Sequence, residues 1–312
     1  AVAANTSMLH LFLHLRCDTL GQAPFTPVTL DFVSFPFGAV FEGDLTCTVD
    51  VLPGISTYVG ADITAGILFS GIYKRPKPSL LLDIGTNGEM ALAAEGRILC
   101  AATAAGPAFE GGNISWGTGS VPGAISSVRC ADGRFAVSTI GGLDPVGICG
   151  SGVVDTVYEA LRSGMIRPDG RFEKSVPGGG LVLAQTRDGQ DIVFCQKDVR
   201  ELQLGKSAIR SGVDSLLNCA GLAYADIETL YVAGGFGTKL NFTSGAGIGL
   251  IPEALAPKVS LIGNSSLGGV VRHLLDYDNV REFAKIVEMS EEHSLSADMF
   301  FNKAFLENIN FG

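Results

Sequence analysis

The segment Leu80–Gly88 places a carboxylate and a small polar turn directly after a buried strand. Its three consecutive leucines are typical of a strand covered on both faces, and this strand runs into Asp83. A carboxylate at such a position needs a metal, a donor or water, so we expect Asp83 to orient a hydrated Mg²⁺. Backbone N–H groups and one hydroxyl of the turn would hold phosphate oxygens, and the turn residues are Gly85, Thr86, Asn87 and Gly88. The alternative is a plain β-hairpin with a polar tip.

The overall composition excludes several classes of protein. The chain has 312 residues, of which 46% are hydrophobic and 17% charged, so it can form one large or two medium domains. The net charge of −10 argues against nucleic acid as a partner. No apolar segment reaches the roughly 18 residues of a membrane helix, so we expect a soluble protein with no membrane partner.

The seven cysteines are spread singly, without any Cys-x₂-Cys or Cys-x₄-Cys spacing. Isolated cysteines in an odd number are typical of reduced thiols, and they predict a cytoplasmic location. The same spacing excludes the standard iron–sulfur and zinc motifs. His10 and His14 are four residues apart, but no Asp or Glu lies beside them, so we expect a half-buried helix face there.

Strands and helices alternate along the chain, which indicates an α/β fold. Apolar patterns and turn residues predict strands at 46–52, 80–84, 89–94, 97–102, 230–233 and 259–262. They predict helices at 8–15, 61–72, 109–116 and 196–220. Residues 80–102 should form a three-strand meander that carries Asp83 at one of its tips.

The proline-rich segment 75–78 is the best candidate for a domain boundary, dividing the chain into residues 1–79 and 80–312. Residues 59–67 echo residues 262–270, and residues 2–6 echo residues 232–237 in the same order. The echoes indicate two copies of one strand–turn–helix arrangement. The second copy begins with the Asp83 hairpin, whereas the first copy lacks such a hairpin because the chain starts too late to contain it.

The Asp-x-Gly-Thr hairpin, the Ala-Gly-Gly-Phe-Gly segment at 233–237 and the duplicated halves resemble the superfamily of actin, sugar kinases and heat-shock chaperones (ASKHA). In that superfamily, two RNase-H-like α/β domains with mixed sheets close on ATP and Mg²⁺. Within it, five segments in order are similar to the reductive activators of corrinoid proteins, and they are 2–11, 104–111, 147–152, 196–204 and 232–237. The resemblance covers nearly the whole chain and implies that the second domain is complete and the first partial.

The resemblance to corrinoid activators also implies a function. These proteins use ATP to drive the reduction of Co(II) to Co(I) in a corrinoid protein of a methyltransferase system. Their electron passes through an iron–sulfur cluster in a domain that this sequence does not contain, and the first phosphate hairpin is missing as well. The chain would then be the ATPase and partner-docking part, or a fragment of a longer protein. A homodimer is a candidate for the assembly of the protein.

The same resemblance assigns further residues to a nucleotide site, each with a structural alternative. Glu89 would contact the water shell of the metal, or merely cap the turn. A helix beginning at Gly150, Ser151 and Gly152 would offer free N–H groups to an anion, or be an ordinary helix start. Gln203 and Lys206, with Arg210, would face adenosine from the long helix, or form a solvated face. Gly234, Gly235 and Gly237 would allow the nucleotide to approach the backbone closely.

Two other functions share these motifs. A small-molecule kinase would need a catalytic base and a substrate cleft in the first domain, and residues 1–79 show no motif for either. A nucleotide-gated scaffold would bind ATP without hydrolysing it. Phosphorylation of a small molecule would favour the kinase, and tight ATP binding without turnover would favour the scaffold.

Overall fold

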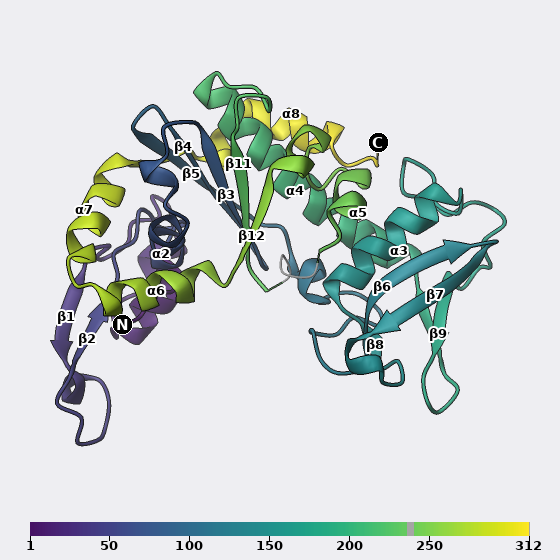
Figure 1. The fold of residues 1–312 in the computed structure, drawn as a ribbon, viewed down its shortest axis with the longest axis horizontal. Helices are drawn as coiled ribbons and strands as arrows, with labels where there is room; N and C mark the ends of the chain where they lie inside the picture. Colours follow the sequence, from purple (N-terminus) through teal and green to yellow (C-terminus); the bar gives the residue numbers. More distant parts are fainter. Residues whose placement is uncertain (236–239, 312) are drawn as a thin grey trace.

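A six-stranded mixed sheet forms the centre of the computed structural model, which describes residues 1–235 and 240–311 (Figure 1). The predicted antiparallel meander is confirmed, with β3 (Ser79–Ile84), β4 (Gly88–Ala94) and β5 (Arg97–Thr103). On one side, β11 (Thr229–Ala233) pairs parallel with β3, and β12 (Val259–Gly263) pairs parallel with β11. On the other side, β13 (Ser290–Glu292) pairs parallel with β5. The sheet therefore has the mixed pairing that we expected.

Helices cover both faces of this sheet, as the leucine run predicted. Leu80 and Leu82 point into a core shared with α4 (Gln196–Ala220), whereas Leu81 points into a second core with α2 (Ala61–Ser70). All three side chains have no exposed surface. Because successive side chains of a strand alternate between faces, only a strand covered on both sides can be apolar throughout.

The two echoing segments lie side by side in the structure. α2 packs against α6 (Ser265–Leu275), and the contact is made by small residues of both helices. A Cβ at Gly269 would lie 2.2 Å from the Ala65 carbonyl oxygen, and one at Gly66 would lie 2.9 Å from Ser265 Oγ. The helices can approach this closely only because both positions lack a side chain, and the approach fixes both helix starts beside β3.

The N-terminal residues add a small hairpin and a short helix to the face that carries α2. The helix α1 (Thr6–Phe12) begins after Asn5, whose side chain accepts a hydrogen bond from the Met8 amide, and it ends before the predicted Leu15. His10 is buried, and its ring nitrogens contact the Thr6 carbonyl oxygen and the Val28 amide. The hairpin strands, which pair antiparallel, are β1 (Val33–Pro36) and β2 (Thr48–Val51).

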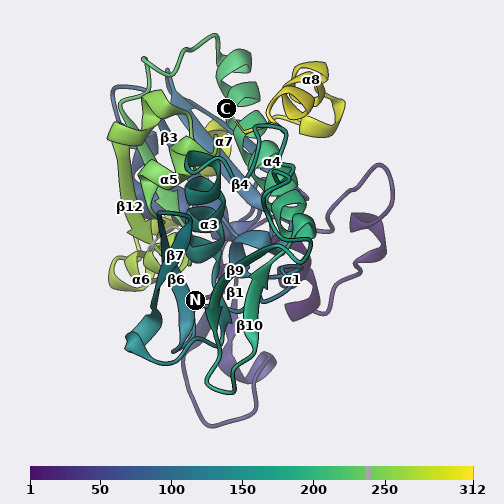
Figure 2. The same cartoon turned by 90° about the vertical axis from the view of Figure 1, so that its right-hand side faces the viewer.

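A second lobe lies at the opposite end of the molecule from the β1–β2 hairpin (Figures 1 and 2). Its long helix α3 (Gly150–Arg162) packs against a three-stranded sheet with the order β7-β6-β8. The strands of this lobe are β6 (Ala124–Ala131), β7 (Arg134–Thr139), β8 (Gly147–Ile148), β9 (Leu181–Gln185) and β10 (Asp191–Phe194). The remaining helices of the chain are α5 (Phe242–Gly247), α7 (Asn279–Met289) and α8 (Met299–Glu307).

Two helix predictions had opposite outcomes. The long helix is confirmed, since α4 covers Gln196–Ala220 with the predicted bounds. The helix predicted for 109–116 is wrong: a short 3₁₀ turn, η4 (Pro107–Glu110), occupies its start. Gly111 adopts a φ of +82° and Asn113 a φ of +61°, and these left-handed conformations end the turn. The turn positions Glu110, which matters for the site described below.

Candidate functional site

Asp83 lies at the carboxyl end of β3, where three elements meet. It stands opposite Glu89 on β4 and opposite Ala233 on β11. Its Oδ2 accepts a hydrogen bond of 3.2 Å from the hydroxyl of Ser265, the first residue of α6. The carboxylate is thus held between the hairpin, the end of β11 and the start of a helix. Asp83 therefore lies near the carboxyl end of a central strand, and not halfway along that strand.

The glycine turn after β11 lies directly against this carboxylate. Gly234 has a φ of +93°, and a Cβ there would lie 2.8 Å from Asp83 Oδ1 and 2.5 Å from the Ile84 carbonyl oxygen. A larger residue would therefore be both strained and in collision at position 234. Gly235 differs, because among the described residues other than its chain neighbours no atom lies within 4 Å of the position that its Cβ would occupy. Gly237, also predicted to contact the nucleotide, is outside the described residues.

Three carboxylates near the end of β3, those of Asp62, Asp83 and Glu89, each have a raised pKa. Burial is the largest cause, and with repulsion from Asp62 it raises the pKa of Asp83 to about 6. Burial, followed by the charges of Asp62 and Asp83, raises the pKa of Glu89 to about 7. The pKa of Asp62, in the first turn of α2, is raised by burial as well. Ionised together, these groups repel one another, so a cation at this place would be favourable.

The carboxylates fit a Mg²⁺ ion that is bound mainly through water and phosphate. Within residues 1–235 and 240–311, no three or more His, Cys, Asp or Glu side chains are arranged to hold a metal by themselves. Mg²⁺ is usually bound by one or two carboxylates together with waters and substrate phosphates, so a complete cage of protein ligands is not required. Asp83 and Glu89 provide the hard oxygen ligands that suit this ion.

The hairpin tip is organised by its own hydrogen bonds. The Gly85 N–H donates to the Asn87 carbonyl oxygen at 2.9 Å, and the Thr86 hydroxyl donates to Glu110 Oε2 at 2.5 Å. Gly88 is needed for packing, because a Cβ there would lie 2.9 Å from Ile209 Cγ1 on α4. A phosphate at the tip would therefore compete with Glu110 for the hydroxyl of Thr86.

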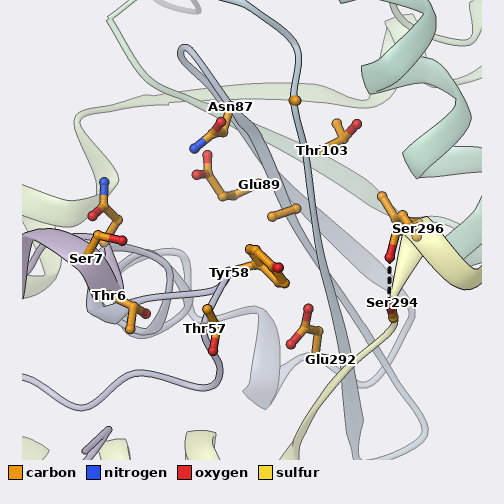
Figure 3. A pocket seen from close by; sticks show the side chains of 14 residues that line it. Thr6, Ser7, Thr57, Tyr58, Asn87, Glu89, Thr103, Glu292, Ser294 and Ser296 are labelled. Carbon is orange, nitrogen blue, oxygen red and sulfur yellow. Dashed lines mark hydrogen bonds between the residues drawn. The ribbon is translucent and has the colours of Figure 1, made fainter. Parts of the chain in front are cut away.

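Asn87 and Glu89 line a polar cavity of about 480 Å³, which we call the hairpin cleft. Figure 3 shows their side chains facing those of Thr6 and Ser7 across the cavity. Segments that are far apart in the sequence complete the walls, and their lining residues include Thr57, Tyr58, Thr103, Glu292, Ser294 and Ser296. Seven hydroxyl groups and two carboxylates stand among apolar side chains in this lining, so the cleft offers polar contacts to a hydrated or cation-bearing ligand.

Gly150, Ser151 and Gly235 line a second cavity of about 260 Å³, which we call the glycine cavity. The other lining residues are Phe109, Glu110, Thr118, Gly119, Ser120 and Cys149. The first N–H groups of a helix have no partner within the helix, and no side-chain hydrogen bond from Cys149 caps α3. The helix start that faces the cavity is therefore suited to an anion.

Within the α3 start, two side-chain positions have structural functions. The Ser151 hydroxyl donates to the Ser126 carbonyl oxygen at 2.9 Å, so it ties α3 to β6. A Cβ at Gly152 would lie 2.3 Å from the Ile125 carbonyl oxygen, so this glycine allows the helix to pack on the strand. Contact with an anion would accordingly come from the backbone at 150–152.

Gln203 and Lys206 hold the C-terminal segment and line neither cavity. Both side chains are buried: the Gln203 amide donates to the carbonyl oxygens of Asp169 and Ile309, and the Lys206 amine to that of Asn310. Burial is the main cause that lowers the pKa of Lys206 to about 8, followed by the charge of Arg210. This part of α4 is therefore not a solvated face.

Three residues of the site were not identified from the sequence. Asp62 and Ser265 lie in the two echoing segments, at the starts of α2 and α6, so the echo was the signal for them. Glu110 lies in the 104–111 segment that carried the resemblance, but its contact with Thr86 spans 24 positions and depends on the fold.

The chain is similar to known proteins over its whole length. Residues 77–312 match the family described as the C-terminal domain of RACo, the ASKHA domain, and residues 1–75 match the RACo middle region. The chain belongs to the RACo family. A solved structure named reductive activator for corrinoid, iron–sulfur protein superposes with a TM-score of 0.92 at 34% sequence identity. The superposition includes 99% of this chain and 52% of the solved chain.

Two curated relatives of this RACo-family chain have related names. One is the corrinoid activation enzyme RamQ of Eubacterium limosum, 33% identical over 99% of this chain and 55% of the relative. The other is the [Co(II) methylated amine-specific corrinoid protein] reductase of Methanosarcina barkeri, 32% identical over 100% of this chain and 62% of the relative. The chain thus spans a little over half the length of these relatives. Over its described residues, no helix has the length and apolar character needed to cross a membrane.

Proposed function

We propose that the chain binds ATP with Mg²⁺ at the hairpin tip, between the hairpin cleft and the glycine cavity. The observation that carries this proposal is the convergence of distant segments on one place. Gly234 touches Asp83, while Gly235, Gly150 and Ser151 share a cavity with Glu110, which is hydrogen-bonded to the hairpin. The match to an ASKHA domain supports a nucleotide as the ligand.

In this proposal, each group has a physical task. Bound Mg²⁺ would neutralise charge on the phosphates. Asp83 and Glu89 orient its water shell, the helix start at Gly150 donates to phosphate oxygens, and Gly235 leaves room for the nucleotide. Gln203 and Lys206 act at a distance, because they fix the C-terminal segment against α4.

We further propose that the nucleotide site serves the reductive activation of a corrinoid protein in a methyltransferase system. The names of the relatives support this function. Reduction of Co(II) to Co(I) is unfavourable, so nucleotide binding must be coupled to docking of the partner if it is to assist the electron transfer. The electron would enter from an iron–sulfur cluster held outside this chain. The contribution of the chain is to dock the corrinoid protein and to couple its nucleotide state to that docking.

The division of the chain and its location are also proposals. Residues 80–312 would be a complete second RNase-H-like domain and residues 1–79 the C-terminal part of the first, which the contact between the echoing helices α2 and α6 supports. All seven cysteines are free thiols, which supports the cytoplasm as the location. We also propose a homodimer. Light scattering tests it by measuring the molar mass of the purified chain in solution.

Replacement of Asp83 tests the nucleotide site. In a protein that contains both halves of the phosphate clamp, we expect Asp83→Ala to lower Mg²⁺-dependent ATP hydrolysis by at least about 100-fold, because the metal loses an orienting carboxylate. Asp191→Ala is the matched control, since Asp191 lies exposed on β10 and bonds Gln185. Hydrolysis at the wild-type rate by folded Asp83→Ala protein would refute the site.

The partner is tested separately. A corrinoid protein reduced to Co(I) or oxidised to Co(II) is passed over the immobilised chain, with and without MgATP. We expect retention of the Co(II) form and a change in its affinity on nucleotide addition. If both forms were retained equally, with and without nucleotide, the coupling would be contradicted. If the chain phosphorylated a small molecule, the kinase function would be supported instead.

A further inference from the structure

Glu110 is an acidic residue shared by the hairpin tip and the glycine cavity. Its Oε2 accepts the hydrogen bond from Thr86 Oγ1 at 2.5 Å, and its side chain lines the cavity together with Gly150, Ser151 and Gly235. The residue is itself exposed to solvent. A nucleotide that reached from the hairpin to Gly235 would therefore pass this carboxylate.

The backbone that carries Glu110 is held firmly. The preceding residue of η4, Phe109, is 1% exposed and belongs to the main core. The turn packs so closely on α4 that a Cβ at Gly205 would lie 2.6 Å from the Ala105 carbonyl oxygen and 2.9 Å from the Phe109 ring. The Glu110 carboxylate is thus attached to a closely packed part of the backbone that lies against α4.

The charges around the two cavities are unfavourable for a bare polyphosphate. Among the residues that the structure describes, no Lys, Arg or His lines either cavity. The ionisable oxygens near the tip belong to carboxylates, those of Asp62, Asp83, Glu89 and Glu110. In addition, the one O–H group of Thr86 is already donated to Glu110. A phosphate would meet negative charge and an occupied donor at the same point.

We propose that Glu110 makes nucleotide binding depend on a divalent cation. Its charge repels a polyphosphate without a metal, and a cation that accompanies the phosphates offsets this charge and frees the Thr86 hydroxyl to donate to them. Glu110 is then a specificity-determining residue that separates metal-bound from metal-free nucleotide. The inference rests on the proposed nucleotide site. It adds a residue that both repels metal-free phosphate and occupies the Thr86 hydroxyl, which Asp83 and Glu89 do not bond.

Titration calorimetry with ATP, in either MgCl₂ or EDTA, tests the inference. For Glu110→Gln, which has the same shape without the charge, we expect Kd for metal-free ATP to fall by about tenfold. Its Kd for MgATP should change by less than about threefold, since the metal already compensates the charge. Glu110→Asp keeps the charge and should keep the wild-type preference for MgATP.

A matched control and the contrary outcomes complete the design. Glu307→Gln removes one charge from α8, in a residue that lines neither cavity, and should leave both Kd values unchanged. If Glu110→Gln kept the wild-type ratio of the two Kd values, or if Glu110→Asp lost it, the inference would be overturned. If the wild-type chain bound no MgATP, the proposed nucleotide site itself would fail. Wild-type binding of MgATP with an unchanged ratio in Glu110→Gln refutes Glu110 alone.

Discussion

The raised pKa of Asp83 predicts that this functional carboxylate destabilises the protein in the absence of a cation. The folded-state pKa is about 6 against an ordinary value of 3.8, and burial is the main cause. Because the folded protein holds this proton more tightly than the unfolded chain, the stabilisation from the protonated group is complete below pH 3.8. It is lost as the pH rises through about 6.

The size of the effect follows from the same two values. A difference from 3.8 to about 6 corresponds to about 3 kcal/mol at full ionisation. Part of this shift is shared with Asp62, and Asp83 is not completely buried, so we expect about 2 kcal/mol. Asp83→Asn, which keeps the shape and an acceptor for Ser265, should therefore stabilise the folded chain by about 2 kcal/mol at pH 8 and by about half of that at pH 5.

Urea unfolding at pH 5 and pH 8, without divalent cations, measures this directly. Glu291→Gln is the control for net charge, because Glu291 is an exposed carboxylate paired with Arg97. Addition of MgATP should stabilise the wild type and not Asp83→Asn, since the ligand binds the folded state. A variant that is less stable than the wild type at pH 8, or equally shifted at both pH values, would refute the reasoning.

Further substitutions test the glycine cavity and the core. Gly235→Val should fold normally, because its Cβ enters open space, yet weaken ATP binding by at least about tenfold in a fluorescence titration; unchanged binding would remove Gly235 from the site. Gly234→Ala should lower stability by about 2 kcal/mol or more in urea, because its Cβ would collide with Asp83 and Ile84 at a positive φ. Leu82→Ala should cost about 2 to 5 kcal/mol, since the side chain is fully buried, and a loss under 1 kcal/mol would contradict the two-sided core.

Local patterns of the sequence predicted the elements that are apolar throughout or strongly periodic. The leucine run at 80–82 predicted a strand covered on both sides, and the period of residues 196–220 predicted α4 with the observed bounds. Both patterns are properties of consecutive residues, and side-chain burial then follows from helix or strand geometry. The helix predicted at 109–116 was wrong, because the prediction used apolar neighbours alone. Residues 111 and 113 adopt left-handed conformations, and these end the turn.

The sequence by itself determined the hairpin with its carboxylate, the glycine turn and the helix start, since each is a local motif with its own chemistry. Only the tertiary structure decided which of them meet. It brought Asp62 and Ser265 to Asp83, placed Glu110 on Thr86, and turned Gln203 and Lys206 towards the C-terminal segment. These outcomes depend on how closely α2, α4 and α6 pack against the sheet. That closeness is set by glycines at 66, 205 and 269, whose missing side chains matter only once their neighbours are in place.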